Sequence, residues 1–166
     1  LGQYERAIED FTEAIRLDPE DPGSYYNRGS VYRKLGQHER VIVDFTEAIR
    51  LDPEHADSYY TRGIAYHRLG QFDRAIADYT EAIRLSPESP GPYHDRGLAY
   101  ENLGKIDRAV EDYTEAIRFA PDYEAAYYNR GRAYSKLEKY DLAIEDFTEA
   151  IRFDPEHPNP YHNRGI

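Results

Sequence analysis

The five-residue sequence Thr-Glu-Ala-Ile-Arg occurs five times in this chain of 166 residues, each copy 34 residues after the one before. The copies begin at Thr12, Thr46, Thr80, Thr114 and Thr148. An Arg-Gly pair keeps the same period and begins at Arg28, Arg62, Arg96, Arg130 and Arg164. A fixed period of about 20 to 50 residues is typical of a solenoid, in which each unit buries its apolar face only by stacking on its neighbours. The repeat therefore predicts a stack of similar units, with no single central core.

Each unit contains two segments with helical periodicity. The first, 24–35 in the best example, carries tyrosines and a leucine at helical spacing and stops at Gly36, a residue suited to a left-handed helix cap. The second, 39–51, has the i, i+3, i+4, i+7 spacing of an amphipathic helix. Its apolar residues are Val41, Ile42, Phe45, Ala48 and Ile49. Pro53 ends this segment, because proline disfavours a helical conformation in the preceding residue.

A longer pattern recurs with the same register in every full unit. In the first full unit it consists of Tyr25, Gly29, Tyr32, Val41, Phe45, Ala48 and Pro53. This pattern resembles the tetratricopeptide repeat (TPR), and the resemblance covers the whole chain. It implies an all-α fold, a right-handed α-solenoid or superhelix of antiparallel helix pairs.

The register divides the chain into one TPR solenoid domain, 1–166, with partial repeats at both ends. We expect a second helix of a partial repeat at 1–21, full repeats at 22–55, 56–89, 90–123 and 124–157, and a first-helix stub at 158–166. Neither end shows the polar cap with which soluble solenoids normally finish. Leu1 stands at repeat position 14 and Ile166 at position 9. Two interpretations stay open: a window on a longer array, or molecules that stack head to tail through the Leu1-side and Ile166-side ends.

Two departures from the family pattern carry structural predictions. Where the family usually has an apolar residue before the glycine, this chain has arginine, and a buried cation needs a partner. Asp44, Asp78, Asp112 and Asp146 keep the same period, so we expect an ion pair such as Arg28 with Asp44, joined by Glu47. An arginine ladder that binds an acidic ligand is the functional alternative. Glu138 replaces the turn glycine and predicts a strained or differently shaped turn.

Composition and motifs exclude several classes of function. The formal net charge of -11 argues against binding nucleic acid, which requires a basic face. No apolar run is long enough for a membrane span, and nothing in the sequence specifies a compartment. There is no cysteine, no phosphate-binding glycine loop and no metalloprotease motif, and the six histidines do not pair at metal-ligand spacing. We therefore expect neither an enzyme nor a metal or cofactor site.

The resemblance also implies where a partner binds, because positions 2, 5, 9, 12 and 13 of the first helix line a concave groove in such proteins. Our candidate contacts at these positions are Tyr26, Arg33, Lys34, Tyr60, His67, Arg68, His94, Tyr128, Arg132 and Lys136. Tyrosine and arginine are typical of binding hot spots, and the basic groups favour a partner that carries carboxylates. The open alternative is that the tyrosines only pack on the adjacent repeat.

The sequence thus predicts a non-catalytic scaffold that binds a protein or peptide along its concave groove. Its alternative is a structural subunit that stacks head to tail into a superhelical filament. The carboxylate clamp of chaperone-binding TPR proteins uses Lys and Asn at positions 5 and 9. Here these positions hold Tyr26, Ser30, Tyr60 and Ile64 in the first two full repeats. Recognition of chaperone tails is therefore not expected.

Overall fold

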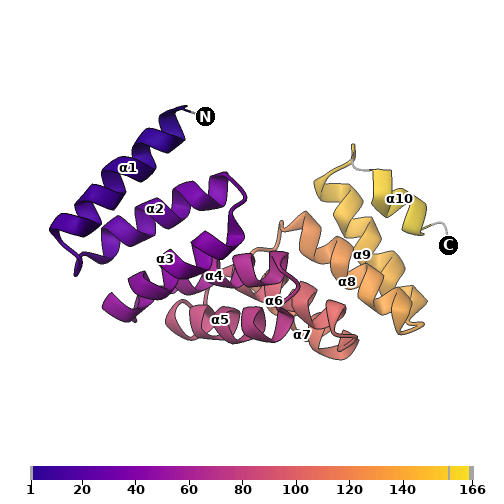
Figure 1. Cartoon of the computed structure of the whole chain (residues 1–166). Coiled ribbons are helices and arrows are strands. Elements are labelled where there is room, and N and C mark those ends of the chain that lie inside the picture. Colours follow the sequence, from indigo (N-terminus) through magenta and orange to yellow (C-terminus); the bar gives the residue numbers. More distant parts are fainter. Residues whose placement is uncertain (1, 157, 165–166) are drawn as a thin grey trace. The chain divides into compact units, whose positions relative to one another are not determined.

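The structure, a computed structural model, describes residues 2–156 and 158–164, and all regular secondary structure in these ranges is helical. In chain order (Figure 1) the helices are α1 (Gly2–Leu17), α2 (Pro22–Lys34), α3 (His38–Leu51), α4 (Ala56–Arg68), α5 (Phe72–Leu85), α6 (Pro90–Asn102), α7 (Ile106–Phe119), α8 (Glu124–Lys136), α9 (Tyr140–Phe153) and α10 (Pro158–Arg164). The predicted all-α fold is confirmed.

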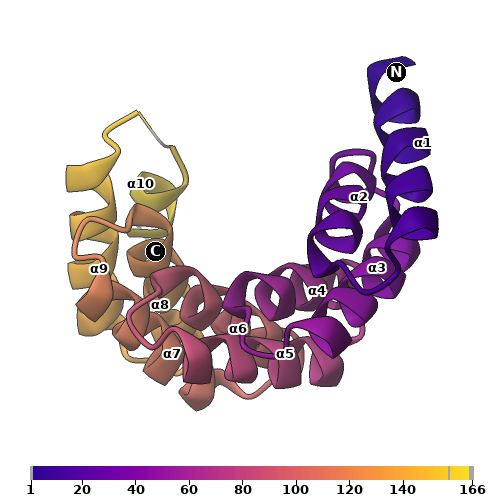
Figure 2. The same ribbon diagram turned by 90° about the vertical axis from the view of Figure 1, so that its left-hand side faces the viewer.

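The chain divides into two compact units, Leu1–Pro87 (unit 1) and Glu88–Ile166 (unit 2), which are described separately. Within each unit, every helix packs on its neighbours in the chain. In unit 1, Figure 2 shows the first helices of the repeats, α2 and α4, on one side and α1, α3 and α5 on the other. In unit 2, α6, α8 and α10 likewise lie opposite α7 and α9. This order confirms a solenoid of helix pairs, while a single domain through 1–166 stays a prediction.

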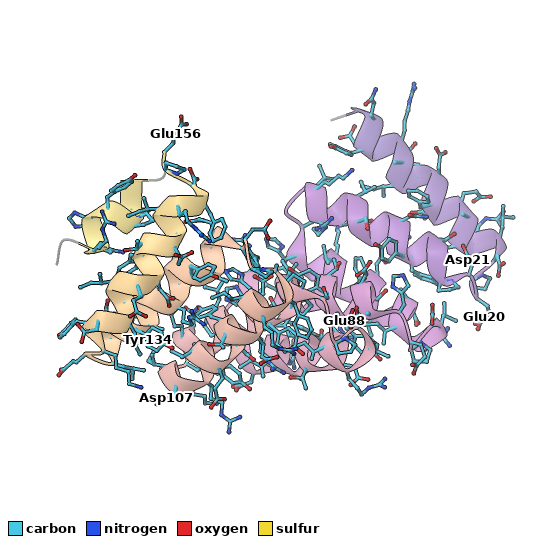
Figure 3. The ribbon with its side chains drawn as sticks, turned by 180° about the vertical axis from the view of Figure 1, so that it is seen from behind. Glu20, Asp21, Glu88, Asp107, Tyr134 and Glu156 are labelled. Carbon is cyan, nitrogen blue, oxygen red and sulfur yellow. The ribbon has the colours of Figure 1, made fainter. Side chains whose placement is uncertain are left out.

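Local sequence signals set the start of α2. Glu20 and Asp21 lie in the loop between α1 and α2 (Figure 3). The Asp21 carboxylate accepts hydrogen bonds from the backbone N–H groups of Gly23 at 3.1 Å and Ser24 at 2.9 Å. Pro22 takes the first helical position, where no N–H is needed. Asp21 therefore acts as the N-cap of α2.

A tight turn joins the two helices of each repeat, and it requires one residue in the left-handed region. The turn glycines Gly36, Gly70 and Gly104 have φ of 70°, 71° and 71°. Glu138 takes the same place with φ of 58°. Its N–H donates to the Ser135 carbonyl at 3.1 Å, and the Lys139 N–H donates to the Tyr134 carbonyl at 3.0 Å, as in the glycine turns. The turn therefore keeps its shape, and the predicted strain lies in the φ of Glu138.

The core of each repeat forms where an aromatic ring of the second helix meets the glycine of the first. Phe45 of α3 and Tyr79 of α5 are both fully buried. A Cβ atom added to Gly63 would lie 2.7 Å from Cε1 and 2.8 Å from Cδ1 of the Tyr79 ring. Only glycine allows the ring to approach this closely, so packing explains why the Arg-Gly pair is periodic.

In each of the four full repeats, the arginine binds the aspartate sixteen residues later, as predicted. Arg28 Nε donates to Asp44 Oδ2 at 2.9 Å, and Nη2 donates to Oδ1 at 2.7 Å. The same two bonds join Arg62 to Asp78, Arg96 to Asp112 and Arg130 to Asp146. Asp44 is buried and Arg28 is half-buried. The expectation that Glu47 joins the pair was wrong, because Glu47 instead accepts a hydrogen bond from Arg50 at 2.7 Å.

The threonine of the repeated sequence is a third member of this contact, which the sequence did not reveal. Thr46 Oγ1 donates to the Ile42 carbonyl at 2.6 Å and accepts a hydrogen bond from Arg62 Nη1 at 3.1 Å. Because Arg62 belongs to the following repeat, its guanidinium joins the second helices of two successive repeats. Arg28 with Thr12 and Arg130 with Thr114 form the same bond, each at 3.0 Å. These arginines thus stabilise the stack, which argues against a role for them in binding an acidic ligand.

Candidate functional site

Two of the candidate tyrosines lie on the first helices of unit 1, and both are half-buried. The Tyr26 ring packs edge-on against Phe45, with ring centroids 5.3 Å apart, and against His55 at 5.1 Å. The Tyr60 ring lies 5.9 Å from that of Tyr79. Each tyrosine therefore packs within the fold while part of its ring stays exposed.

The basic candidates of unit 1 lie at the carboxyl ends of α2 and α4. Arg33 and Lys34 lie in the last turn of α2, and Arg68 is the last residue of α4. All three are exposed, and within residues 2–156 and 158–164 they form no hydrogen bond or ion pair. The neighbouring His67 differs, because it packs edge-on against Phe72 with ring centroids 5.2 Å apart. We call Arg33, Lys34 and Arg68 the unit 1 basic cluster.

The local sequence keeps this cluster positive. α2 contains no acidic residue, and the one acid of α4, Asp57, lies in its first turn at the far end of the helix. The helix carboxyl termini carry partial negative charge from their unpaired carbonyl groups, which favours cations there. Unit 1 therefore presents exposed cations in a chain whose formal net charge is -11.

A pocket of about 180 Å³ opens at the other end of α2 and α4. Gly23 and Tyr26 of α2, Ala48 of α3, and Asp52 and His55 from the connection to α4 contribute to its walls. Gly23 and Tyr26 occupy repeat positions 2 and 5, two of the predicted groove positions. The pocket and the basic cluster thus belong to the same pair of first helices, the pocket at their amino ends and the cluster at their carboxyl ends.

The candidate His94, in unit 2, is buried, and both of its ring nitrogens have partners. Nδ1 lies 2.9 Å from Asp95 Oδ1, and Nε2 lies 3.0 Å from the amide nitrogen of Asn129 on α8. The ring also packs against Tyr123, with centroids 4.9 Å apart. His94 therefore joins α6 to α8 and offers little surface to a ligand.

The basic candidates of unit 2 lie beside an acid. Glu101 Oε1 accepts a hydrogen bond from Lys136 Nζ at 2.6 Å and lies 3.9 Å from Arg132 Nη2. Its other oxygen accepts from the Tyr113 hydroxyl at 2.8 Å. Burial, aided by the Glu101 charge, raises the pKa of Tyr113 far above its usual value, so the hydroxyl keeps its proton and donates it.

Tyr128, the last candidate, is half-buried on α8. Its hydroxyl accepts a hydrogen bond from the Asn163 amide of α10 at 3.2 Å, and the Arg132 guanidinium lies over its ring at 5.8 Å. The sequence analysis did not select Glu101 or Asn129 as site residues. The available signal was that Glu101 occupies the same repeat position as Arg33, so one repeat has an acid where another has a cation. Most candidate side chains at the groove positions of unit 2 thus form hydrogen bonds or ion pairs with other residues of unit 2.

The described ranges hold neither a metal-binding cluster nor a membrane-spanning helix. Within residues 2–156 and 158–164, no three His, Asp, Glu or Cys side chains come together to hold a metal ion. No helix in these ranges has the length and apolar composition needed to cross a bilayer.

Helix pairs that each build the same small core and stack in chain order are typical of an α-solenoid repeat protein. The tetratricopeptide repeat model matches residues 124–157, and a second TPR model matches 1–36, 29–70, 65–104 and 102–138. The chain therefore belongs to the tetratricopeptide repeat family. Comparison with curated protein sequences gave no match.

Several solved structures share this fold. A crystal structure of MamA matches with a TM-score of 0.90 and 26% identity, over 93% of this chain and 91% of that one. YrrB, described as a TPR protein with an unusual peptide-binding site, matches with a TM-score of 0.88 and 25% identity, over 99% and 85%. A thermophilic TPR protein of Thermus thermophilus matches in fold, with a TM-score of 0.72 and 22% identity over 99% and 90%.

Proposed function

We propose that this protein is a non-catalytic scaffold that binds an acidic peptide segment along the first-helix face of unit 1. The observation that carries the proposal is the unit 1 basic cluster, in which Arg33, Lys34 and Arg68 are exposed. These cations pair with no other residue that the structure describes, so they are available to carboxylates of a ligand, and they also steer an acidic partner toward the face.

The contrast between the two units supports this choice of face. In unit 2, Lys136 and Arg132 already lie beside Glu101. An acidic ligand would have to compete with that carboxylate, which costs binding energy. The peptide-binding site named for YrrB gives independent support, because that protein shares both the fold and 25% of its residues with this chain. The candidates Tyr128, Arg132, Lys136 and His94 stay predictions with a smaller expected contribution.

Selection from a phage-displayed library of random dodecapeptides tests the proposal. We expect the wild-type chain to enrich peptides rich in Asp and Glu, whose binding weakens as salt is raised. The variant Arg33→Glu/Arg68→Glu should lose this enrichment and keep its helicity by circular dichroism.

The matched control is Arg6→Glu/Arg108→Glu, which makes the same change in net charge on the exposed residues of two second helices. This control should still enrich acidic peptides. If both double variants lose binding equally, net charge alone explains the effect and the site is wrong. If the wild-type chain enriches no acidic peptide, the proposed function fails.

A second candidate function is head-to-tail stacking of copies. Its support is two charged side chains that form no Arg–Asp ion pair within residues 2–156 and 158–164. Asp10 occupies the position of Asp44 on α1, and Arg164 occupies the position of Arg28 on α10. Both are exposed. α1 also contains no buried residue, although it repeats the apolar pattern of α3. Arg164 of one copy and Asp10 of the next would reproduce the pair seen inside the chain.

Sedimentation velocity over a range of protein concentrations tests this candidate on the chain of 166 residues. If copies stack, the assemblies should grow longer as the protein concentration rises. Asp10→Arg should give shorter assemblies, and Asp10→Arg/Arg164→Asp should restore the wild-type length. A single monomeric species at every concentration would rule it out.

A further inference from the structure

We infer that the pocket at the amino ends of α2 and α4 holds an uncharged apolar side chain of the same acidic peptide, about four or five residues from its acidic group. This inference rests on the proposed function and adds to it a second contact and a fixed spacing. Its basis is that one pair of helices carries both the pocket and the unit 1 basic cluster.

The size and chemistry of the pocket suit a leucine or phenylalanine side chain. An apolar cavity of about 150 Å³ is large enough for a benzene molecule, and this pocket measures about 180 Å³. The Tyr26 ring and the Ala48 methyl group supply apolar wall. Tyr26 is held in place by its edge-on contacts with Phe45 and His55, so the wall exists before a ligand arrives.

Charge distinguishes the two ends of this face. Asp52 lies in the pocket wall, and its carboxylate disfavours an Asp or Glu side chain there. The unit 1 basic cluster at the other end favours one. The face therefore selects a peptide whose apolar and acidic groups are separated, rather than a peptide that is acidic throughout.

Helix geometry sets the separation. Tyr26 in the pocket wall and Lys34 are eight positions apart on α2, which corresponds to about 12 Å along the helix axis. From Ser58, another pocket residue, to Arg68 on α4 the distance is about 15 Å. An extended peptide spans about 3.3 Å per residue, so four or five residues bridge the two sites.

Synthetic peptides test the spacing on the intact chain. Each peptide has a Gly-Ser backbone with two consecutive Glu residues, and a single Leu is placed two, four, five or eight residues from the nearer Glu, on either side. The reference peptide has Ser in place of Leu. We expect Leu at the spacing of four or five to tighten the dissociation constant on the order of tenfold over the reference, since burying a leucine contributes that much. Leu at the spacing of two or eight should give no gain.

Tyr26→Ala then tests the pocket itself. This variant should lose the tenfold gain of the Leu peptide over the reference peptide, because the pocket loses a wall. Tyr4→Ala removes an exposed tyrosine of α1, which lies outside the pocket and is not a candidate contact, and should keep the gain. Circular dichroism checks that each variant folds.

The outcomes separate this inference from the proposed function. If no Glu-containing peptide binds, both fail. If the reference peptide binds and Leu adds nothing at any spacing, or adds equally at all spacings, the proposed function stands and the pocket inference is overturned. A gain that survives Tyr26→Ala also overturns it.

Discussion

Arg62 holds Asp78 by two parallel hydrogen bonds, from Nε to Oδ2 and from Nη2 to Oδ1, each 2.8 Å long. The side chains are 16% and 8% exposed, so the pair is largely removed from water. The guanidinium also donates to Thr46 of the preceding repeat at 3.1 Å. A periodic charge pair thus lies at a packing position between the two helices of the repeat, and its energetics can be measured.

Removing one partner of this pair should cost far more than removing both. Arg62→Met leaves the Asp78 carboxylate buried without its cation, and we expect a loss of about 3 kcal/mol in the free energy of unfolding at neutral pH. Arg62→Met/Asp78→Leu leaves no buried charge and should recover most of that loss. Urea denaturation of the wild type, both single variants and the double variant measures the coupling. Additive single and double effects would show that the pair is not coupled.

The stability of Arg62→Met should depend on pH in a direction that the pKa of Asp78 sets. Burial raises the pKa of the Asp78 carboxyl above its usual value, and Arg62 partly offsets that effect. A raised pKa in the folded state means that the contribution of Asp78 to stability falls as the pH rises through that pKa. Without Arg62 the pKa rises further, so Arg62→Met should regain stability relative to the wild type as the pH is lowered from about 7 to about 5. Arg62→Met/Asp78→Leu, which lacks the carboxyl group, should show no such relative gain in urea titrations.

Gly63→Ala should destabilise the protein although alanine is the better helix former. Alanine normally improves a helix interior by about 0.5 to 1 kcal/mol, but its Cβ here would lie 2.7 Å from the Tyr79 ring. Overpacking of this kind typically costs about 1 to 3 kcal/mol. Thermal and urea unfolding should therefore show a net loss. Gly2→Ala, whose new Cβ would meet no atom of another described element within 4 Å, should show none.

Glu138→Gly should stabilise the protein by about 1 kcal/mol. Glu138 has a φ of 58°, which costs an L-residue about 1 to 2 kcal/mol and costs glycine little. The reciprocal change, Gly104→Glu at φ of 71°, should destabilise by a similar amount. The two variants are compared by their urea midpoints. Equal stability of Glu138→Gly and the wild type would show that this φ carries no strain.

The sequence predicted the contacts that form within one repeat and recur with the 34-residue period. The 34-residue period gave the helix pairs, and the coupled periods of arginine and aspartate predicted the contact of Arg28 with Asp44. It failed for Glu47, because Arg50 lies one turn away on the same helix and is the nearer cation. Thr46 escaped notice because a threonine on a helix surface gives no sign that an arginine of the next repeat reaches it.

The candidate site was predictable as a set of positions but not as a set of roles. Position within the repeat placed Arg33, Lys34 and Arg68 on the first helices, and the structure shows that they are exposed. Position could not show that His94 is buried between two helices, or that Glu101 lies beside Lys136. Each of those contacts joins residues on α6 and α8 that lie about one repeat apart.

What the sequence alone determined is the repeating architecture, because the apolar spacing, the turn glycines and the Arg-Gly pairs act within a repeat or between direct neighbours. Only the tertiary structure decided which charges stay available. Arg132 and Arg68 are the same residue type, but Arg132 lies near the Glu101 carboxylate, whereas Arg68 is exposed. The pocket beside Tyr26 likewise arises where three helices meet, and no single segment of the chain encodes it.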